Sequence, residues 1–85
     1  MANYLLSNLN IDIISEEIGE FLDKCKVDRK DAMRIKLAAE EILLNYQECF
    51  GEEQKVALDC RKRFGRPRIV LNVNAARFNP MEEKV

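Results

Sequence analysis

Glu41 and Asn45 are the residues of this chain whose types and spacing point most directly to chemistry at a site. They lie four positions apart in the stretch EEILLNYQECFGEE, residues 40–53, and a helix places such a pair one turn apart on one face. The amide oxygen can bind Mg²⁺, and the carboxylate can act on a water molecule near that ion. The same spacing is common in solvated helices, so the pair has an ordinary structural interpretation beside the functional one.

The amino-acid composition removes several other kinds of active site. With 85 residues, the chain is long enough for one domain with a modest core. It contains no histidine, so the usual general base and a phospho-accepting histidine are absent. Its three cysteines form no C-x-x-C pair, which predicts reduced thiols in a cytosol and no metal site: Cys25, Cys49 and Cys60. No apolar run approaches the ~20 residues that span a bilayer, and the N-terminus lacks the features of a signal peptide.

Positive charge is concentrated near the C-terminal end. The net charge is −1, but residues 1–60 carry 7 basic and 13 acidic side chains, whereas residues 61–85 carry 7 basic and 2 acidic ones. Five basic residues surround one turn: Arg61, Lys62, Arg63, Arg66 and Arg68. This cluster is either a solvated hairpin tip that resists aggregation or a contact surface for anionic lipid headgroups, an acidic protein or a phosphate. Nucleic acid is not expected, because the rest of the chain is acidic and Phe64 is the one aromatic residue in the cluster.

The first half of the chain predicts a strand followed by a helix. Apolar and polar residues alternate from Leu9 to Ile13, which favours a strand within residues 4–14. Ser15 is a suitable N-cap, and the acidic residues after it favour a helix start. The helix then presents one apolar stripe: Ile18, Phe21, Leu22 and Cys25.

A longer helix is predicted between Asp28, a good N-cap, and Gly51, a good C-terminal stop. Its buried stripe is expected to contain six residues: Ile35, Ala38, Ala39, Ile42, Tyr46 and Cys49. Apolar residues on the reverse side indicate that a second face is also covered: Met33, Leu37 and Leu44. Glu41 and Asn45 fall together on one border of the main stripe.

After this helix, the spacing of the apolar residues changes from the helical period to every second residue, as in a strand. KVALDCRK (55–62) and RIVLNVN (68–74) alternate apolar and polar residues, and RFGRP between them supplies a turn, so a β-hairpin is predicted. Residues 78–80 are expected to end the regular structure. The fold class is therefore α+β, with two helices packed on one face of a small, mostly antiparallel sheet in the order β-α-α-β-β. The open sheet face and edges predict association with a partner, including a second copy of the chain.

The run RIKLAAEEILLNYQECFGE, followed by a hairpin and Phe-Asn-Pro, resembles the N-terminal half of the histidine-kinase-like ATPase domain, especially its anti-sigma-factor branch. The resemblance implies a truncated form of that fold, in which Asn45 binds Mg²⁺ and Glu41 acts as base or supports the metal. Two further family features are not found in these residues: the Asp-x-Gly-x-Gly motif, and the lid glycines, which lie beyond residue 85 or are absent. The family's Asp-x-Gly-x-Gly motif falls on Val73 and Ala75, which are neither Asp nor Gly.

The chain also has just three glycines, and none belongs to a loop that could approach a triphosphate. One amide and one carboxylate do not suffice to bind ATP without a phosphate-binding loop and an adenine pocket. Glu41 and Asn45 are therefore interpreted as the remnant of a nucleotide site, and neither catalysis nor a cofactor is expected.

A second resemblance covers nearly the whole chain. Three blocks are similar to the soluble N-terminal extension of bacterial sodium:dicarboxylate (or cation:amino-acid) symporter-like proteins: residues 50–53, 62–67 and 78–80. The resemblance implies that residues 1–80 form one cytosolic domain, and that the polar tail 81–85 leads to the rest of a larger membrane protein. The domain would then lie at the cytoplasmic face of the cell membrane.

The leading interpretation is a non-catalytic regulatory or interaction domain of a symporter-like transporter. Its expected partners are the downstream transporter domain or another protein, and an anionic membrane surface. The alternative is a fragment of an active histidine-kinase-like ATPase or anti-sigma-type serine kinase, which would bind Mg-ATP through Glu41 and Asn45. A free-standing anti-sigma-like partner-switch subunit is a third interpretation.

Overall fold

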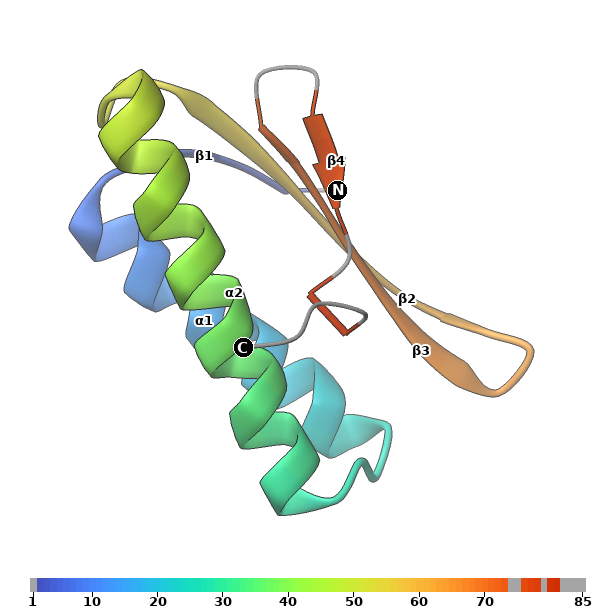
Figure 1. The fold of residues 1–85 in the computed structure, drawn as a ribbon. Coiled ribbons are helices and arrows are strands. Elements are labelled where there is room, and N and C mark those ends of the chain that lie inside the picture. Colours follow the sequence, from blue (N-terminus) through green and yellow to red (C-terminus); the bar gives the residue numbers. More distant parts are fainter. Residues whose placement is uncertain (1, 74–75, 79, 82–85) are drawn as a thin grey trace.

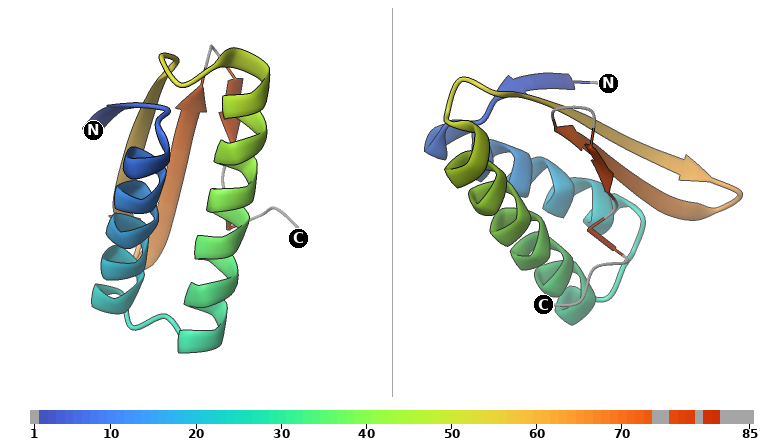
Figure 2. Two further views of the ribbon diagram at one scale, coloured as in Figure 1. Left: turned by 90° about the vertical axis from the view of Figure 1, so that its left-hand side faces the viewer. Right: turned by 45° about the horizontal axis from the view of Figure 1, so that its top comes forward.

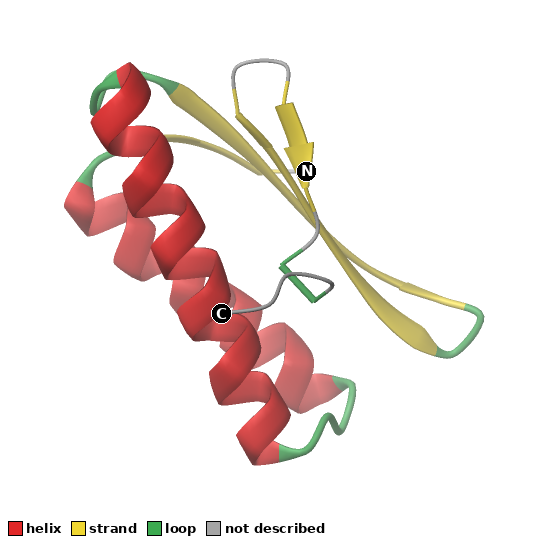
Figure 3. Cartoon of the chain, viewed as in Figure 1, coloured by secondary structure: helices red, strands yellow, loops and turns green. Residues whose placement is uncertain are grey.

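Two helices cover one side of a four-stranded antiparallel sheet (Figures 1 and 3). The computed structural model describes residues 2–73, 76–78 and 80–81. The elements are β1 (Ala2–Leu5), α1 (Asn8–Lys24), α2 (Arg29–Phe50), β2 (Lys55–Arg63), β3 (Arg66–Val73) and β4 (Ala76–Phe78), and the strands are ordered β1-β2-β3-β4. The predicted α+β class, with both helices on one sheet face, is confirmed. The short strand β4 was not predicted.

The core lies between the helices and the inner face of the β2–β3 hairpin. As the alternation predicts, five strand residues of this face are at most 3% exposed: Val56, Leu58, Ile69, Leu71 and Val73. The helices contribute residues at helical spacing to the same cluster: Ile11, Ile14, Ile18, Leu22, Ile35, Ala39 and Leu43. The left view of Figure 2 shows the two helices side by side in front of the sheet.

The prediction of a strand within residues 4–14 is wrong for most of its length. The structure has a strand at Ala2–Leu5, and α1 already begins at Asn8. Ser7 is the N-cap, and its Oγ accepts a hydrogen bond from the backbone N–H of Asn10 at 3.2 Å. Burial explains why this segment is a helix and not a strand. Ile11 and Ile14 are three residues apart, so a helix buries both on one face, whereas a strand would turn them to opposite faces.

Ser15 is consequently not a cap but a buried residue inside α1. It is 3% exposed, and its Oγ has no hydrogen-bond partner among the described residues. The true C-terminus of α1 is closed by Lys26, which adopts a left-handed backbone conformation with φ 60°. The N–H of Lys26 bonds to the carbonyl of Asp23, and the N–H of Val27 bonds to the carbonyl of Leu22. These two bonds form a Schellman motif, built here on a lysine instead of the usual glycine.

The helix predicted between Asp28 and Gly51 is confirmed, since Asp28 is the N-cap and Gly51 the C-cap of α2. Its buried stripe was only partly predicted. Leu43, which was not expected there, is fully buried, whereas the expected Cys49 is exposed. The residues predicted to be covered on a second face are about half exposed instead: Met33, Leu37 and Leu44.

Gln47 connects the end of α2 to the segment between β1 and α1. Its side-chain amide donates to the carbonyl oxygen of Leu6 and to Oδ1 of Asn8, both at 2.9 Å. Leu6 itself is fully buried, and its N–H bonds to the carbonyl of Gln54 at 2.8 Å. At the other end of the chain, Pro80 is buried and Met81 packs partly against the core. The side chain of Phe78 and the tail residues 82–85 lie outside the described part of the structure.

Ser7 and Ser15 give a direct test of where α1 begins. We expect Ser7→Ala to lower the free energy of unfolding by about 1 kcal/mol, because it removes the N-cap hydrogen bond. Ser15→Ala should raise it by about 0.5–1 kcal/mol, because it removes an unpaired buried hydroxyl and favours the helix. Urea unfolding followed by far-UV circular dichroism measures both. A loss of stability in Ser15→Ala with no effect of Ser7→Ala would show that α1 starts at the later serine.

Candidate functional site

Four arginines gather on the sheet face that the helices leave open. In the β2–β3 pairing, Arg61 lies opposite Arg68 and Arg63 lies opposite Arg66. Side chains alternate along a strand, and the neighbouring Cys60 and Ile69 face the helices, so all four arginines point to the other side. We call these four residues the arginine face. Lys62, the fifth basic residue predicted for this site, lies opposite Pro67. The alternation of side chains along β2 places it on the inner face, not with the four arginines.

The charge of the arginine face is largely uncompensated. Nε of Arg61 donates to Oδ1 of Asp59 at 3.0 Å, and this is the only ion pair among the described residues. Like charges directly opposite one another on adjacent strands destabilise a sheet by roughly 0.2–1 kcal/mol per pair, and the arginine face contains two such pairs. The arginines are therefore held together by the strand register and not by attraction to one another.

A shallow groove of about 390 Å³ runs over this part of the hairpin. It is lined by Asp59, Arg61, Lys62, Arg63, Arg68 and Val70. Val70 is 6% exposed, so the groove has an apolar floor between charged walls. Guanidinium groups in such a setting can bind carboxylate or phosphate oxygens through paired N–H donors.

Phe64 occupies the tip of the hairpin and is 93% exposed. The two loop residues, Phe64 and Gly65, have φ of 53° and 77°, the positive values of a type I′ turn. Glycine or asparagine is preferred at both positions, and a left-handed phenylalanine costs about 1–2 kcal/mol. The guanidinium carbon of Arg63 lies 5.7 Å from the centre of the Phe64 ring. The phenylalanine therefore neither stabilises the turn nor makes the surface more soluble.

The hairpin tip also lies apart from the rest of the molecule. Figure 1 and the right view of Figure 2 show β2 and β3 diverging from the helices toward their connecting turn. Phe64 and the flanking arginines can therefore reach an external surface without interference from α1 or α2.

Glu41 and Asn45, predicted as a remnant nucleotide site, are both exposed on α2. Neither lines the groove beside the arginine face or the groove between α1 and α2. Val73, at the position where the resemblance to histidine-kinase-like domains predicts an aspartate, is fully buried in the core, and Ala75 lies outside the described residues. The pair thus has no adenine-reading carboxylate at the expected end of β3.

The three glycines of the chain have other structural tasks. Gly51 ends α2 and Gly65 lies in the hairpin turn, both with positive φ. At Gly19, an added Cβ would lie 3.0 Å from Cδ of Lys36, so this glycine accommodates a side chain of the neighbouring helix. None of them belongs to a phosphate-binding loop beside Asn45. Among the described residues, no group of three or more acidic or cysteine side chains is placed to hold a metal ion.

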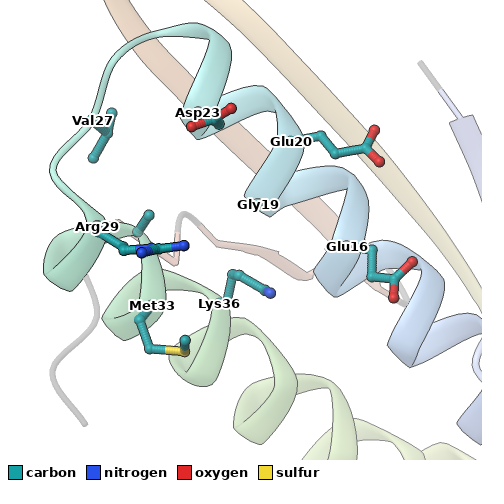
Figure 4. A pocket seen from close by; sticks show the side chains of 9 residues that line it. Glu16, Gly19, Glu20, Asp23, Val27, Arg29, Met33 and Lys36 are labelled. Carbon is teal, nitrogen blue, oxygen red and sulfur yellow. The ribbon is translucent and has the colours of Figure 1, made fainter.

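A second groove, of about 720 Å³, lies between the helices near their connection (Figure 4). Its α1 wall is acidic, with Glu16, Glu20 and Asp23, and Arg29 and Lys36 extend from α2 toward it. The sequence did not single out this groove, although three acidic residues at helical spacing could have indicated it. Its opposite charges largely offset each other, so it favours no single class of ligand as the arginine face does.

Tyr4 of β1 and Glu17 of α1 form a polar contact, and Cys60 of β2 is a half-buried thiol. The Tyr4 hydroxyl donates to the Glu17 carboxylate, and this bond raises the pKa of Tyr4 to about 12. Burial raises the pKa of Cys60 to about 11, so this thiol is neutral and unreactive at neutral pH. The Tyr4–Glu17 bond connects β1 to α1.

No protein-family model, curated protein sequence or solved structure matches this chain. Within the described residues, no helix is both long and apolar enough to cross a bilayer. The site must therefore be judged on its own geometry, and this geometry favours the arginine face together with Phe64. The basic residues of this site were predicted from the sequence, but Phe64 was not. The sequence does contain an indication of it, because a two-residue turn prefers asparagine or glycine where this chain has phenylalanine.

Replacing Phe64 by asparagine tests whether the tip is strained. Asparagine adopts positive φ more readily, so we expect Phe64→Asn to raise the free energy of unfolding by about 1 kcal/mol. Equilibrium urea unfolding measures the change, and Gly65→Ala, which introduces strain at the next position, should lower stability. A destabilised Phe64→Asn protein would mean that the ring makes a stabilising contact and is not held for an external purpose.

Proposed function

We propose that this chain is a non-catalytic regulatory or interaction domain that binds an anionic partner through the arginine face. The observation that carries the proposal is the placement of two directly opposed arginine pairs on one open sheet face. Such an arrangement weakens the hairpin in isolation. An anionic partner removes the repulsion and forms charge-assisted hydrogen bonds with the same guanidinium groups.

The arginine face includes residues on which the resemblance to symporter-like proteins rests. The block Lys62–Pro67, which resembles part of symporter-like N-terminal extensions, is the turn that carries Phe64 and half of the arginine face. We therefore propose that the domain has the front half of a histidine-kinase-like ATPase fold and belongs to a larger membrane transporter, at the cytoplasmic side. The partner is then the downstream transporter domain, another protein or the adjoining membrane. Association of two copies through the short edge strands β1 and β4 remains a prediction.

Calorimetric titration with poly-L-glutamate, a soluble polyanion, tests the proposal. We expect wild-type protein to bind with an affinity that falls as salt is added. Arg66→Glu/Arg68→Glu should weaken binding by about tenfold or more. This variant places opposite charges across the two strands, so the hairpin itself becomes more stable. The loss of binding therefore cannot be assigned to unfolding.

The matched control is Lys30→Glu/Arg34→Glu, which makes the same change of net charge at two exposed positions of α2. Its affinity for poly-L-glutamate should remain close to that of the wild type. Equal losses in both variants would reduce the effect to net charge and would remove the arginine face as a site. Titration with Mg-ATP addresses the enzyme alternative: micromolar binding that disappears in Asn45→Ala would contradict a non-catalytic domain.

A further inference from the structure

We propose that the hairpin docks tip first on an anionic lipid bilayer, with the Phe64 ring inserted among the headgroups and the arginine face bound to lipid phosphates. The inference rests on the proposed function, since it assigns a partner class to the same arginine face. It adds a residue, Phe64, and an orientation of the domain on the membrane.

Phe64 is disfavoured at the tip of a free hairpin. The ring is 93% exposed and the backbone has φ 53°, so water contact and conformation both disfavour a phenylalanine at this position. Burial of the ring in a partner removes its contact with water, and the free energy gained offsets the cost of the left-handed backbone. A bilayer accepts a single apolar side chain without a preformed pocket, whereas a protein partner must supply one.

The residue types along the hairpin follow the order expected for docking on a bilayer by its tip. Arg63 and Arg66 flank the tip directly, and Arg61 and Arg68 form a second row two residues further back. At ~3.3 Å per strand residue the rows are separated by ~7 Å. The headgroup layer on each side of a bilayer is about 5–8 Å thick. An inserted Phe64 therefore places the first row among the lipid phosphates and the second within the electrostatic field of the surface.

The placement of Phe64 relative to the arginines favours lipid over nucleic acid and over an acidic protein. Single strands bind where bases stack on aromatic rings that lie among the cations. No aromatic residue lies between the two rows of the arginine face; Phe64 lies in the turn beyond the Arg63–Arg66 pair, with its ring beside the Arg63 guanidinium. A protein interface buries an apolar centre inside a polar rim, whereas here one ring stands at the apex with charges behind it.

The charge of the helices sets the orientation. Residues 8–50, which contain α1 and α2, carry ten acidic and six basic side chains. An anionic leaflet repels this layer and attracts the hairpin. Because the tip diverges from the helices (Figure 1), the domain can touch the bilayer with the tip while the helices remain in water.

The chain has no tryptophan, so Phe64→Trp introduces a unique fluorophore at the tip. We expect this variant to bind vesicles of phosphatidylserine and phosphatidylcholine, with a blue shift of its emission, and not to bind vesicles of phosphatidylcholine alone. In sedimentation with the mixed vesicles, Phe64→Asn should lower the affinity about tenfold or more because the ring is lost. Arg66→Glu/Arg68→Glu should lower it at least twenty-fold, at about fivefold per arginine removed. Lys30→Glu/Arg34→Glu should bind as the wild type does.

The other outcomes separate this inference from the proposed function. Vesicle binding without a blue shift, or with equal affinity in Phe64→Asn, overturns insertion at the tip. Binding to poly-L-glutamate or single-stranded RNA but not to vesicles overturns the membrane assignment and leaves an anion-binding arginine face. Binding to none of these probes removes both.

Discussion

The burial of one face of the β2–β3 hairpin against α1 and α2 is the interaction on which the rest of the structure depends. Side chains such as Leu58 and Leu71 each contribute about 1.5–3 kcal/mol when they leave water, and they lie opposite one another in the pairing. A slip of one residue in either strand would turn its apolar set toward solvent. The apolar face therefore fixes the register, and the register in turn fixes which side the arginines occupy.

This constraint explains how the hairpin tolerates features that local rules disfavour. The opposed pair Arg63 and Arg66 and the left-handed Phe64 both weaken an isolated hairpin. The buried inner face holds the register regardless, so the tip can be shaped by what it binds. Departures from local preference of this kind concentrate at functional sites. At Glu41 and Asn45 no comparable departure occurs, because exposed polar residues on a helix surface satisfy every local rule.

Much of this fold could be predicted from the sequence, and the failures have physical causes. The hairpin and α2 have long periodic patterns, and α2 also has clear caps, so the position of both elements along the chain was predicted correctly. The segment Leu9–Ile13 is too short to distinguish the two-residue period of a strand from the 3.6-residue period of a helix. The adjacent apolar residues Ile13 and Ile14 break the strand alternation and therefore indicate the helix better. β1 and β4 have four and three residues, and their pairing with longer strands defines them more than their own composition does. The arginines were visible as a cluster, but their shared face follows from strand register, which composition does not contain.

The central claim is that the sheet face left open by the helices is the binding face. Chemical-shift mapping of the ¹⁵N-labelled protein against phosphatidylserine-containing nanodiscs tests it most directly. We expect the amide signals of residues 61–68 to shift or broaden at the lowest lipid ratios, while those of Glu41, Asn45 and the helix groove remain unchanged. Changes centred on α1 or α2, with residues 61–68 unaffected, would contradict the account.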